Sequence, residues 1–259
     1  MILVDVRGQW QGTRFVDLVP IPLVEGALVS YPLLSGGVDT LVGGWDFDRS
    51  EVQRALALRQ TGSLIKPIFY SLAYDMGVPP SAHFSGESFH EGEYNPTGDK
   101  ATAGALLWDA LAFSMNAMSL RVLREIKERL PSSRGNADLT RLKDWGTKLG
   151  LGRPLQGNPS EVLGADQTPL DMAKAMGVFP TRGLAASVPL IRKVVDTSGR
   201  ILEEDMQPVD PHANLGDAVR ALWRTTVKPI APVIDPTTAY LTMANLQDCL
   251  LYTSDAADE

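Results

Sequence analysis

The stretch Arg59-Gln-Thr-Gly-Ser-Leu-Ile-Lys-Pro67 carries an SxxK motif at the start of a helical pattern. From Ser63 onward, apolar residues recur at spacings of three and four until Gly77 and two prolines end the pattern. A spacing of three puts the Ser63 hydroxyl and the Lys66 amine one above the other on a single helix face. A serine beside an amine that can take its proton is typical of nucleophilic catalysis.

An ordinary structural role stays open for an isolated SxxK motif. In that interpretation Ser63 caps the helix and Lys66 points into water. The catalytic interpretation requires Lys66 to spend time as the neutral amine, although a model lysine has a pKa of about 10.4. The helix N-terminus contributes only about 0.3–1 kcal/mol toward that, so desolvation and a second cation have to supply the rest.

Two more short motifs follow the SxxK motif in the chain. Ser114-Met-Asn116 is an SxN motif in a second helical region, and Val162–Ala173 reads VLGADQTPLDMA. Upstream, two strand candidates, Glu25–Tyr31 and Val38–Val42, lead into Leu41-Val-Gly-Gly44. Each motif is short, but chance is a poor explanation for all of them in this order.

Taken together, these motifs closely resemble the class A penicillin-binding proteins. In that family an RQxGSxxKP segment follows a strand pair ending in Gly-Gly, an SxN motif lies on a helical segment downstream, and an LGxxExTPLxMAxAY stretch comes next. The resemblance covers about Glu25 to Asp248, with Asp166 and Gln167 near the family's usual Glu. It implies an α+β fold of the penicillin-binding protein and serine β-lactamase-like transpeptidase type. Such a fold has an antiparallel sheet and an all-helical subdomain, and its C-terminal strands are expected to be missing here.

The resemblance also implies roles for individual residues. Ser63 is the nucleophile and Lys66 its base. Ser114 relays the proton to the leaving amine, and Asn116 holds both the substrate amide and Lys66. The backbone N–H of Ser63 forms half of an oxyanion hole. The remaining residues that the resemblance assigns to substrate binding are Thr61 and Gly62.

By resemblance the reaction is peptidoglycan D,D-transpeptidation, without a cofactor or a metal. Ser63 attacks the penultimate D-Ala carbonyl of a stem peptide and passes the acyl group to an amine on a neighbouring strand, and β-lactams trap the same serine. A D,D-carboxypeptidase, a β-lactam sensor and a non-catalytic cell-wall-binding domain stay open as alternatives. Hydrolysis of the class A β-lactamase type needs a carboxylate in an ExxLN-like loop, and Glu161-Val-Leu-Gly164 lacks the Asn, which favours transfer.

The resemblance further implies a place and a partner domain for the full-length protein. Family members sit at the extracytoplasmic, periplasmic face of the bacterial inner membrane, with a membrane anchor and an upstream glycosyltransferase domain. Residues 1–24 are then expected to be the remnant of an interdomain connector, and residues 25–248 a partial transpeptidase domain. No stretch of this chain approaches the ~20 consecutive apolar residues of a membrane helix.

The last eleven residues, Cys249–Glu259, resemble the translation of a transposon-type sequencing adapter and are predicted not to belong to the gene. The family's KTG/KSG motif, whose lysine would be the second cation, does not occur in this sequence. We therefore expect a fragment cut before that motif, inactive by itself. Unpaired strand edges would make it marginally stable and prone to aggregate.

Other segments show the patterns of ordinary strands, helices and turns. Thr168 and Thr237 are placed to cap the two helices that follow them. The expected strands are residues 2–6, 13–19, 191–196 and 200–202, and the expected helices are residues 103–130 (one or two), 139–149, 169–179 and 236–248.

Composition excludes several classes of partner. The net charge of −7, with basic residues scattered, argues against nucleic acid. The single cysteine, Cys249, allows no internal disulfide and no cysteine-based zinc site. His83, His90 and Glu91 lie in a polar loop without the spacing of an HExxH motif, so no metal site is predicted.

Overall fold

The structure of the chain, a computed structural model, describes residues 3–19, 22–33, 37–87, 89, 104–133, 136–185, 191, 193–204 and 232–255. It combines helices with short antiparallel strand pairs, which confirms the predicted α+β class. The α-helices are α1 (Lys66–Asp75), α2 (Leu107–Ala112), α3 (Asn116–Arg129), α4 (Thr140–Leu149), α5 (Pro169–Gly177) and α7 (Pro236–Asp255).

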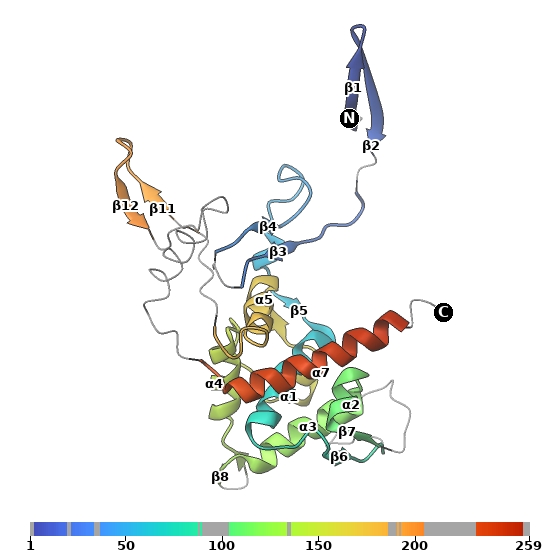
Figure 1. The fold of residues 1–259 in the computed structure, drawn as a ribbon, viewed down its shortest axis with the longest axis vertical. Coiled ribbons are helices and arrows are strands. Elements are labelled where there is room, and N and C mark those ends of the chain that lie inside the picture. The colour runs from blue at the N-terminus through green and yellow to red at the C-terminus, as the bar shows by residue number, and fades with distance from the viewer. Residues whose placement is uncertain are drawn as a thin grey trace, which may run out of the picture.

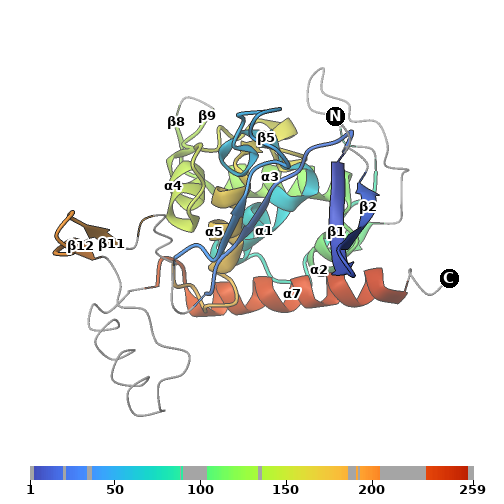
Figure 2. The ribbon, with the colours of Figure 1, turned by 90° about the horizontal axis from the view of Figure 1, so that it is seen from above.

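Helix α1 lies at the centre of the helical core. Every residue from Lys66 to Tyr74 is buried, and only Asp75 is partly exposed. A helix that is buried on all sides belongs inside a core rather than on its surface. Helices α2, α3, α4 and α7 all pack against α1, and α7 runs along one side of the bundle (Figures 1 and 2). The SxxK segment is thus enclosed by several helices.

Within the described residues, the strands form six two-stranded antiparallel sheets. The β1–β2 and β11–β12 hairpins stand apart from the helical core in Figure 1. The pairs are β1 (Leu3–Trp10) with β2 (Thr13–Val19), β3 (Leu28–Ser30) with β4 (Thr40–Val42), β5 (Arg59–Gln60) with β10 (Asp166–Gln167), β6 (His83–Phe84) with β7 (Ala105–Leu106), β8 (Ser132–Ser133) with β9 (Asn136–Ala137), and β11 (Lys193–Val195) with β12 (Ile201–Glu204).

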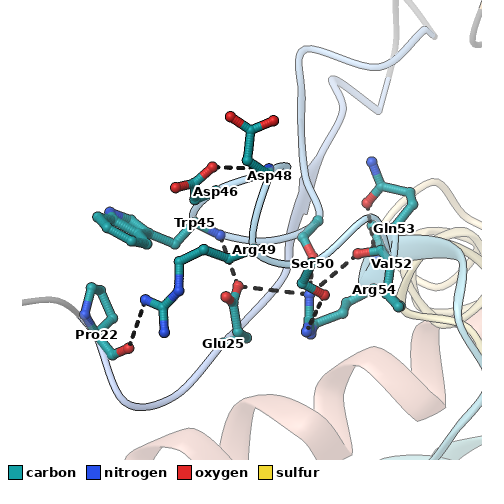
Figure 3. A network of polar contacts seen from close by, with 12 residues as sticks. Pro22, Glu25, Trp45, Asp46, Asp48, Arg49, Ser50, Val52, Gln53 and Arg54 are labelled. Atoms are coloured by element: carbon teal, nitrogen blue, oxygen red, sulfur yellow. Dashed lines mark hydrogen bonds and ion pairs between the residues drawn. The ribbon is translucent and has the colours of Figure 1, made fainter. Parts of the chain in front are cut away.

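A polar network joins the segment before β3 to the loop after β4 (Figure 3). The Glu25 carboxylate accepts the backbone N–H of Trp45 at 2.8 Å and pairs with the Arg54 guanidinium at 3.6 Å. Arg54 also donates to the carbonyl of Gly43 at 3.3 Å. A Cβ atom on Gly44 would lie 2.9 Å from the Glu25 carboxylate. The second glycine of the Gly-Gly pair therefore leaves room for this network.

Most of the predicted helices are confirmed. Helix α4 matches the predicted segment 139–149 to within one residue, and α5 begins at Pro169 as expected but ends at Gly177. The Thr168 hydroxyl caps α5 by accepting the backbone N–H of Asp171 at 3.0 Å. The segment 103–130 forms two helices rather than one, because the chain turns at Ser114 between α2 and α3.

The last helix begins at Pro236 as predicted, but its cap and its C-terminal end differ from the prediction. Asp235, not Thr237, supplies the cap, since its carboxylate accepts the backbone N–H of Thr237 at 2.7 Å. This hydrogen bond holds the pKa of Asp235 below its ordinary value. Helix α7 also continues past Asp248 to Asp255, and the residues in between include no glycine or proline that would end it.

A buried amide connects α7 to the two helices beside it. Asn245 has no exposed surface, and its side chain accepts the Tyr74 hydroxyl at 2.7 Å and donates to the Trp108 carbonyl at 2.9 Å. Replacing Asn245 by Ala should lower the free energy of unfolding by about 2–4 kcal/mol, because two buried polar groups lose their partner. Urea unfolding measures this change.

The matched control is Tyr240→Ala on the same helix. Tyr240 is 68% exposed, so its replacement should change the free energy of unfolding by no more than about 0.5 kcal/mol. Equal losses in the two variants would show that the buried amide is not what docks α7.

Candidate active site

The SxxK motif begins with a 3-10 turn. Helix η2 (Gly62–Ile65) starts at Gly62, which has a φ of +55°, and runs directly into α1. The backbone N–H of Lys66 donates to the carbonyl of Ser63 across this turn. Residues three apart are nearly eclipsed in a 3-10 turn, so Ser63 and Lys66 lie on one face, as the spacing predicts.

The structural alternative for Ser63 and Lys66 is wrong in this structure. No side chain caps the start of η2 or of α1, so Ser63 is not an N-cap. Lys66 has no exposed surface and does not point into water. Because a long charged side chain is almost never fully buried without partners, the surroundings of Lys66 decide what this site can do.

Lys66 meets the SxN motif. Its Nζ atom lies 2.6 Å from the Ser114 carbonyl oxygen, 2.7 Å from Asn116 Oδ1 and 3.1 Å from Ser114 Oγ. These three oxygens are uncharged, so the hydrogen bonds favour an ammonium while full burial disfavours it. The structure therefore brings together three of the four predicted catalytic residues from segments far apart in sequence.

Ser114 has an uncommon backbone conformation. Its φ is +52°, in the left-handed region that non-glycine residues seldom adopt, and it stands in the turn before α3 rather than on a helix as predicted. Such a conformation costs on the order of 1–3 kcal/mol and persists only where the surroundings enforce it. Here it accompanies the approach of both Ser114 oxygens to Lys66.

Ser63 is placed differently from the other three residues. It is exposed, and within the described residues its hydroxyl makes no hydrogen bond. Lys66 Nζ is therefore not hydrogen-bonded to the Ser63 hydroxyl in this conformation. Catalytic hydrogen bonds commonly tighten only when a substrate is bound, so the open position is compatible with a nucleophile.

Thr61 connects the turn before α1 to Ala165, the residue directly before β10, through hydrogen bonds. Its hydroxyl lies 3.0 Å from the Ala165 carbonyl oxygen and 3.2 Å from the Ala165 nitrogen, and its own N–H donates to the same carbonyl at 3.0 Å. This contact extends the pairing of β5 with β10. The Thr61 side chain is thus occupied within the protein, and its role in substrate binding, like that of Gly62, stays a prediction.

A pocket of about 390 Å³ lies beside the nucleophile segment. This pocket was not predicted from the sequence, although the spacing of four between Met172 and Met176 places both on one face of α5. Its main lining residues are Arg59, Gln60, Thr61, Leu64, Met172 and Met176.

Glu161 is already engaged in local structure. Its carboxylate accepts the backbone N–H groups of Gln156, Gly157 and Asn158 at 2.7–3.1 Å, and it forms a capping box with Asn158 at helix η3 (Pro159–Val162). The carboxylate oxygens of Glu161 are thus occupied by backbone donors of its own loop. Glu161 is therefore a structural cap in this chain.

The described residues contain no group of three or more His, Cys, Asp or Glu side chains placed to hold a metal ion. His83 lies in β6, whereas His90 and Glu91 fall outside the described residues. No helix in the described part is long and apolar enough to cross a membrane.

Curated relatives found by sequence comparison share one name, penicillin-binding protein 1A. The chain is 32% identical to penicillin-binding protein 1A of Neisseria flavescens over 261 residues, covering 94% of this chain and 28% of the relative. Identity to penicillin-binding protein 1A of Pseudomonas aeruginosa is 30% over 218 residues, covering 80% and 25%. The chain thus spans less than a third of the length of these relatives. No family model matches the chain.

Solved structures show the same fold. Penicillin-binding protein 1A from Haemophilus influenzae superposes with a TM-score of 0.70 at 24% identity, covering 90% of this chain and 36% of that one. PonA1 from Mycobacterium tuberculosis in complex with penicillin V gives a TM-score of 0.62 at 19% identity, covering 85% and 54%. At these identities the likeness concerns the fold.

The positive φ of Gly62 leads to a stability prediction. A Cβ atom at Gly62 would meet nothing within 4 Å, so Gly62→Ala imposes only backbone strain. We expect a loss of about 1–2 kcal/mol in the free energy of unfolding, measured with a chemical denaturant.

Gly26→Ala is the matched control for Gly62→Ala. Gly26 also has open space around it, and its φ lies outside the left-handed region. Its replacement should leave stability unchanged or raise it by up to about 1 kcal/mol. A Gly62→Ala variant as stable as Gly26→Ala would mean that the nucleophile turn does not need its left-handed glycine.

Proposed function

Because the chain belongs to the class A penicillin-binding proteins and has the fold of their transpeptidase domain, we propose that it is the acyl-transferring part of a peptidoglycan D,D-transpeptidase. The observation that carries the proposal is the meeting of the Lys66 amine with Ser114 and Asn116, one turn below an exposed Ser63. The stem-peptide donor, the amine acceptor and β-lactams as inhibitors belong to the same proposal.

In the proposed reaction Lys66, as the neutral amine, takes the proton of the Ser63 hydroxyl. The Ser63 oxygen then bonds to the penultimate D-Ala carbonyl carbon, and the backbone N–H of Ser63 stabilises the oxyanion. The C–N bond to the terminal D-Ala breaks when its nitrogen receives the proton through Ser114. An acceptor amine then bonds to the acyl carbon, the C–O bond to Ser63 breaks, and a proton given up by that amine restores the Ser63 hydroxyl.

Asn116 suits a bridging role in this scheme. Its Oδ1 faces Lys66 Nζ at 2.7 Å, which leaves the Nδ2 end for a substrate carbonyl. Ser114 lies within 3.1 Å of the same amine through its hydroxyl, the position that a proton relay requires. Both side chains thus support the roles that the sequence predicts for them.

Two alternatives to acyl transfer remain, one with a different fate of the acyl group and one without catalysis. A D,D-carboxypeptidase or β-lactam sensor would pass the acyl group to water or retain it, and the engagement of Glu161 in a cap is unfavourable for a deacylating base of the β-lactamase kind. Product analysis with and without an acceptor amine separates these reactions. The intact SxxK and SxN motifs argue against a non-catalytic cell-wall-binding domain, which a KTG/KSG motif absent from the source gene itself would support.

The proposal extends to the surroundings of the domain. We place it at the periplasmic face of the bacterial inner membrane, in a protein with a membrane anchor and a glycosyltransferase domain. Residues 1–24 would then belong to a connector, and residues 249–259 to a sequencing adapter.

Labelling with a fluorescent penicillin tests the nucleophile. The chain alone should label slowly, because losing one oxyanion donor costs about 100- to 1,000-fold in rate. Joining residues 1–248 to the part of Neisseria flavescens penicillin-binding protein 1A that follows the matching helix should restore fast labelling. Ser63→Ala should abolish the label, whereas Ser198→Ala in the exposed β11–β12 turn should retain it. Fast labelling of Ser63→Ala would exclude this serine, and a folded fusion without label would favour the non-catalytic alternative.

Reading the source locus across codon 248 tests the boundary. We expect codons for a KTG/KSG motif shortly downstream, in place of those for Cys249–Glu259. The control is an independent amplification from a primer outside the adapter-like stretch. A genuine stop after codon 259 would contradict the predicted boundary.

A further inference from the structure

Helix α1 carries a second functional group one turn after Lys66. Tyr70 lies four residues on, on the same side of the helix, and has no exposed surface. Its hydroxyl lies 3.1 Å from the hydroxyl of Ser119 on α3, which is also fully buried. Two hydroxyl groups thus meet inside the core, between α1 and α3.

The direction of these hydrogen bonds follows from the partners. The Ser119 hydroxyl donates to the Met115 carbonyl at 2.7 Å, which uses its only hydrogen. Tyr70 must then be the donor to Ser119. Burial raises the pKa of Tyr70 above its ordinary value, which favours the protonated phenol that this donation requires. The result is a continuous relay from Tyr70 through Ser119 to Met115.

The relay ends inside the SxN motif. Met115 stands between Ser114 and Asn116, the two residues that bind Lys66. The strained turn is thus held from two sides, by the Lys66 amine on Ser114 and by Ser119 on Met115. Both sets of hydrogen bonds start from α1, one at Lys66 and the other at Tyr70, one turn apart.

The Ser119 hydroxyl does more than bond within its own helix. The Met115 carbonyl already accepts the backbone N–H of Ser119 at 3.1 Å, and the hydroxyl adds a second hydrogen bond to the same oxygen. The same hydroxyl accepts the buried Tyr70 hydroxyl, which an apolar residue at position 119 would leave without this acceptor. Ser119 therefore links α1 to the Met115 carbonyl and to the turn around it.

We propose that Ser119, supported by Tyr70, is a positioning residue that holds the SxN turn at the Lys66 amine. The inference rests on the proposed function, because the placement of Lys66 matters only if it acts as the base for Ser63. Neither residue touches the reacting atoms, and neither was singled out from the sequence.

The test measures how readily the Lys66 amine is acetylated in the folded chain, which does not depend on enzymatic activity. The folded chain is first acetylated to a small extent with acetic anhydride at one pH. It is then unfolded in denaturant and fully acetylated with the isotopically heavy reagent. Mass spectrometry of the Lys66 peptide gives the ratio of light to heavy label, which measures how accessible and reactive Lys66 was in the folded chain. Exposed Lys148 is the internal reference. Ser119→Ala and Tyr70→Phe should each raise Lys66 labelling by roughly 3- to 10-fold relative to Lys148, the range expected for a lost buried hydrogen bond.

Ser71→Ala is the matched control. Ser71 is the residue after Tyr70, is equally buried, and bonds Trp145 and the Ile68 carbonyl instead of the SxN turn. It should leave the ratio of Lys66 to Lys148 labelling unchanged at a comparable loss of melting temperature. Ser119→Thr, which keeps the hydroxyl, should restore the original ratio.

The outcomes separate this inference from the proposed function. Increased labelling in Ser119→Ala and Tyr70→Phe, but not in Ser71→Ala or Ser119→Thr, supports the positioning role. An unchanged ratio in Ser119→Ala, or an equal rise in Ser71→Ala, overturns it. Neither outcome depends on penicillin labelling of Ser63, whose failure would reject the proposed function alone.

Discussion

The structure depends on the burial of one amine. Lys66 has no contact with water, so protein oxygens must satisfy its N–H groups. Those oxygens come from Ser114 and Asn116, which can reach it only because α2 ends and α3 begins at that point. The left-handed conformation of Ser114 is the local cost of the arrangement, on the order of 1–3 kcal/mol.

The surrounding packing keeps this arrangement in place. Helix α1 is buried along its length, so it cannot shift without disturbing the helices that pack against it. At its start, the short β5–β10 pairing and the Thr61–Ala165 contacts fix the turn that presents Ser63. The base is thus held by helix packing, and the nucleophile by a strand pair between distant parts of the chain.

Local sequence signals account for what could be predicted. The SxxK helix, α4 and α5 with its Thr168 cap have clear apolar periodicity or capping residues. The turn at Ser114 has no such signal, because its φ is imposed by tertiary contacts and serine has no preference for the left-handed region. The cap of α7 also had a local signal that the prediction of Thr237 missed, because Asp235 stands directly before a proline at the first helical position. The two-residue strands β5 and β10 are too short to show alternation.

The two halves of the proposed site have different structural origins. The proton-transfer half, Lys66 with Ser114 and Asn116, is assembled by helices within residues 66–129 and is complete in the described structure. The half that would stabilise an oxyanion includes the N–H of Ser63 in the turn before α1, and each donor of such a site is worth about 2.7–4 kcal/mol of transition-state stabilisation. That amount concerns the rate of a reaction and not the folding of the helical core, which rests on the packing around α1. The placement of the base and the stabilisation of an oxyanion are therefore separable properties of this chain.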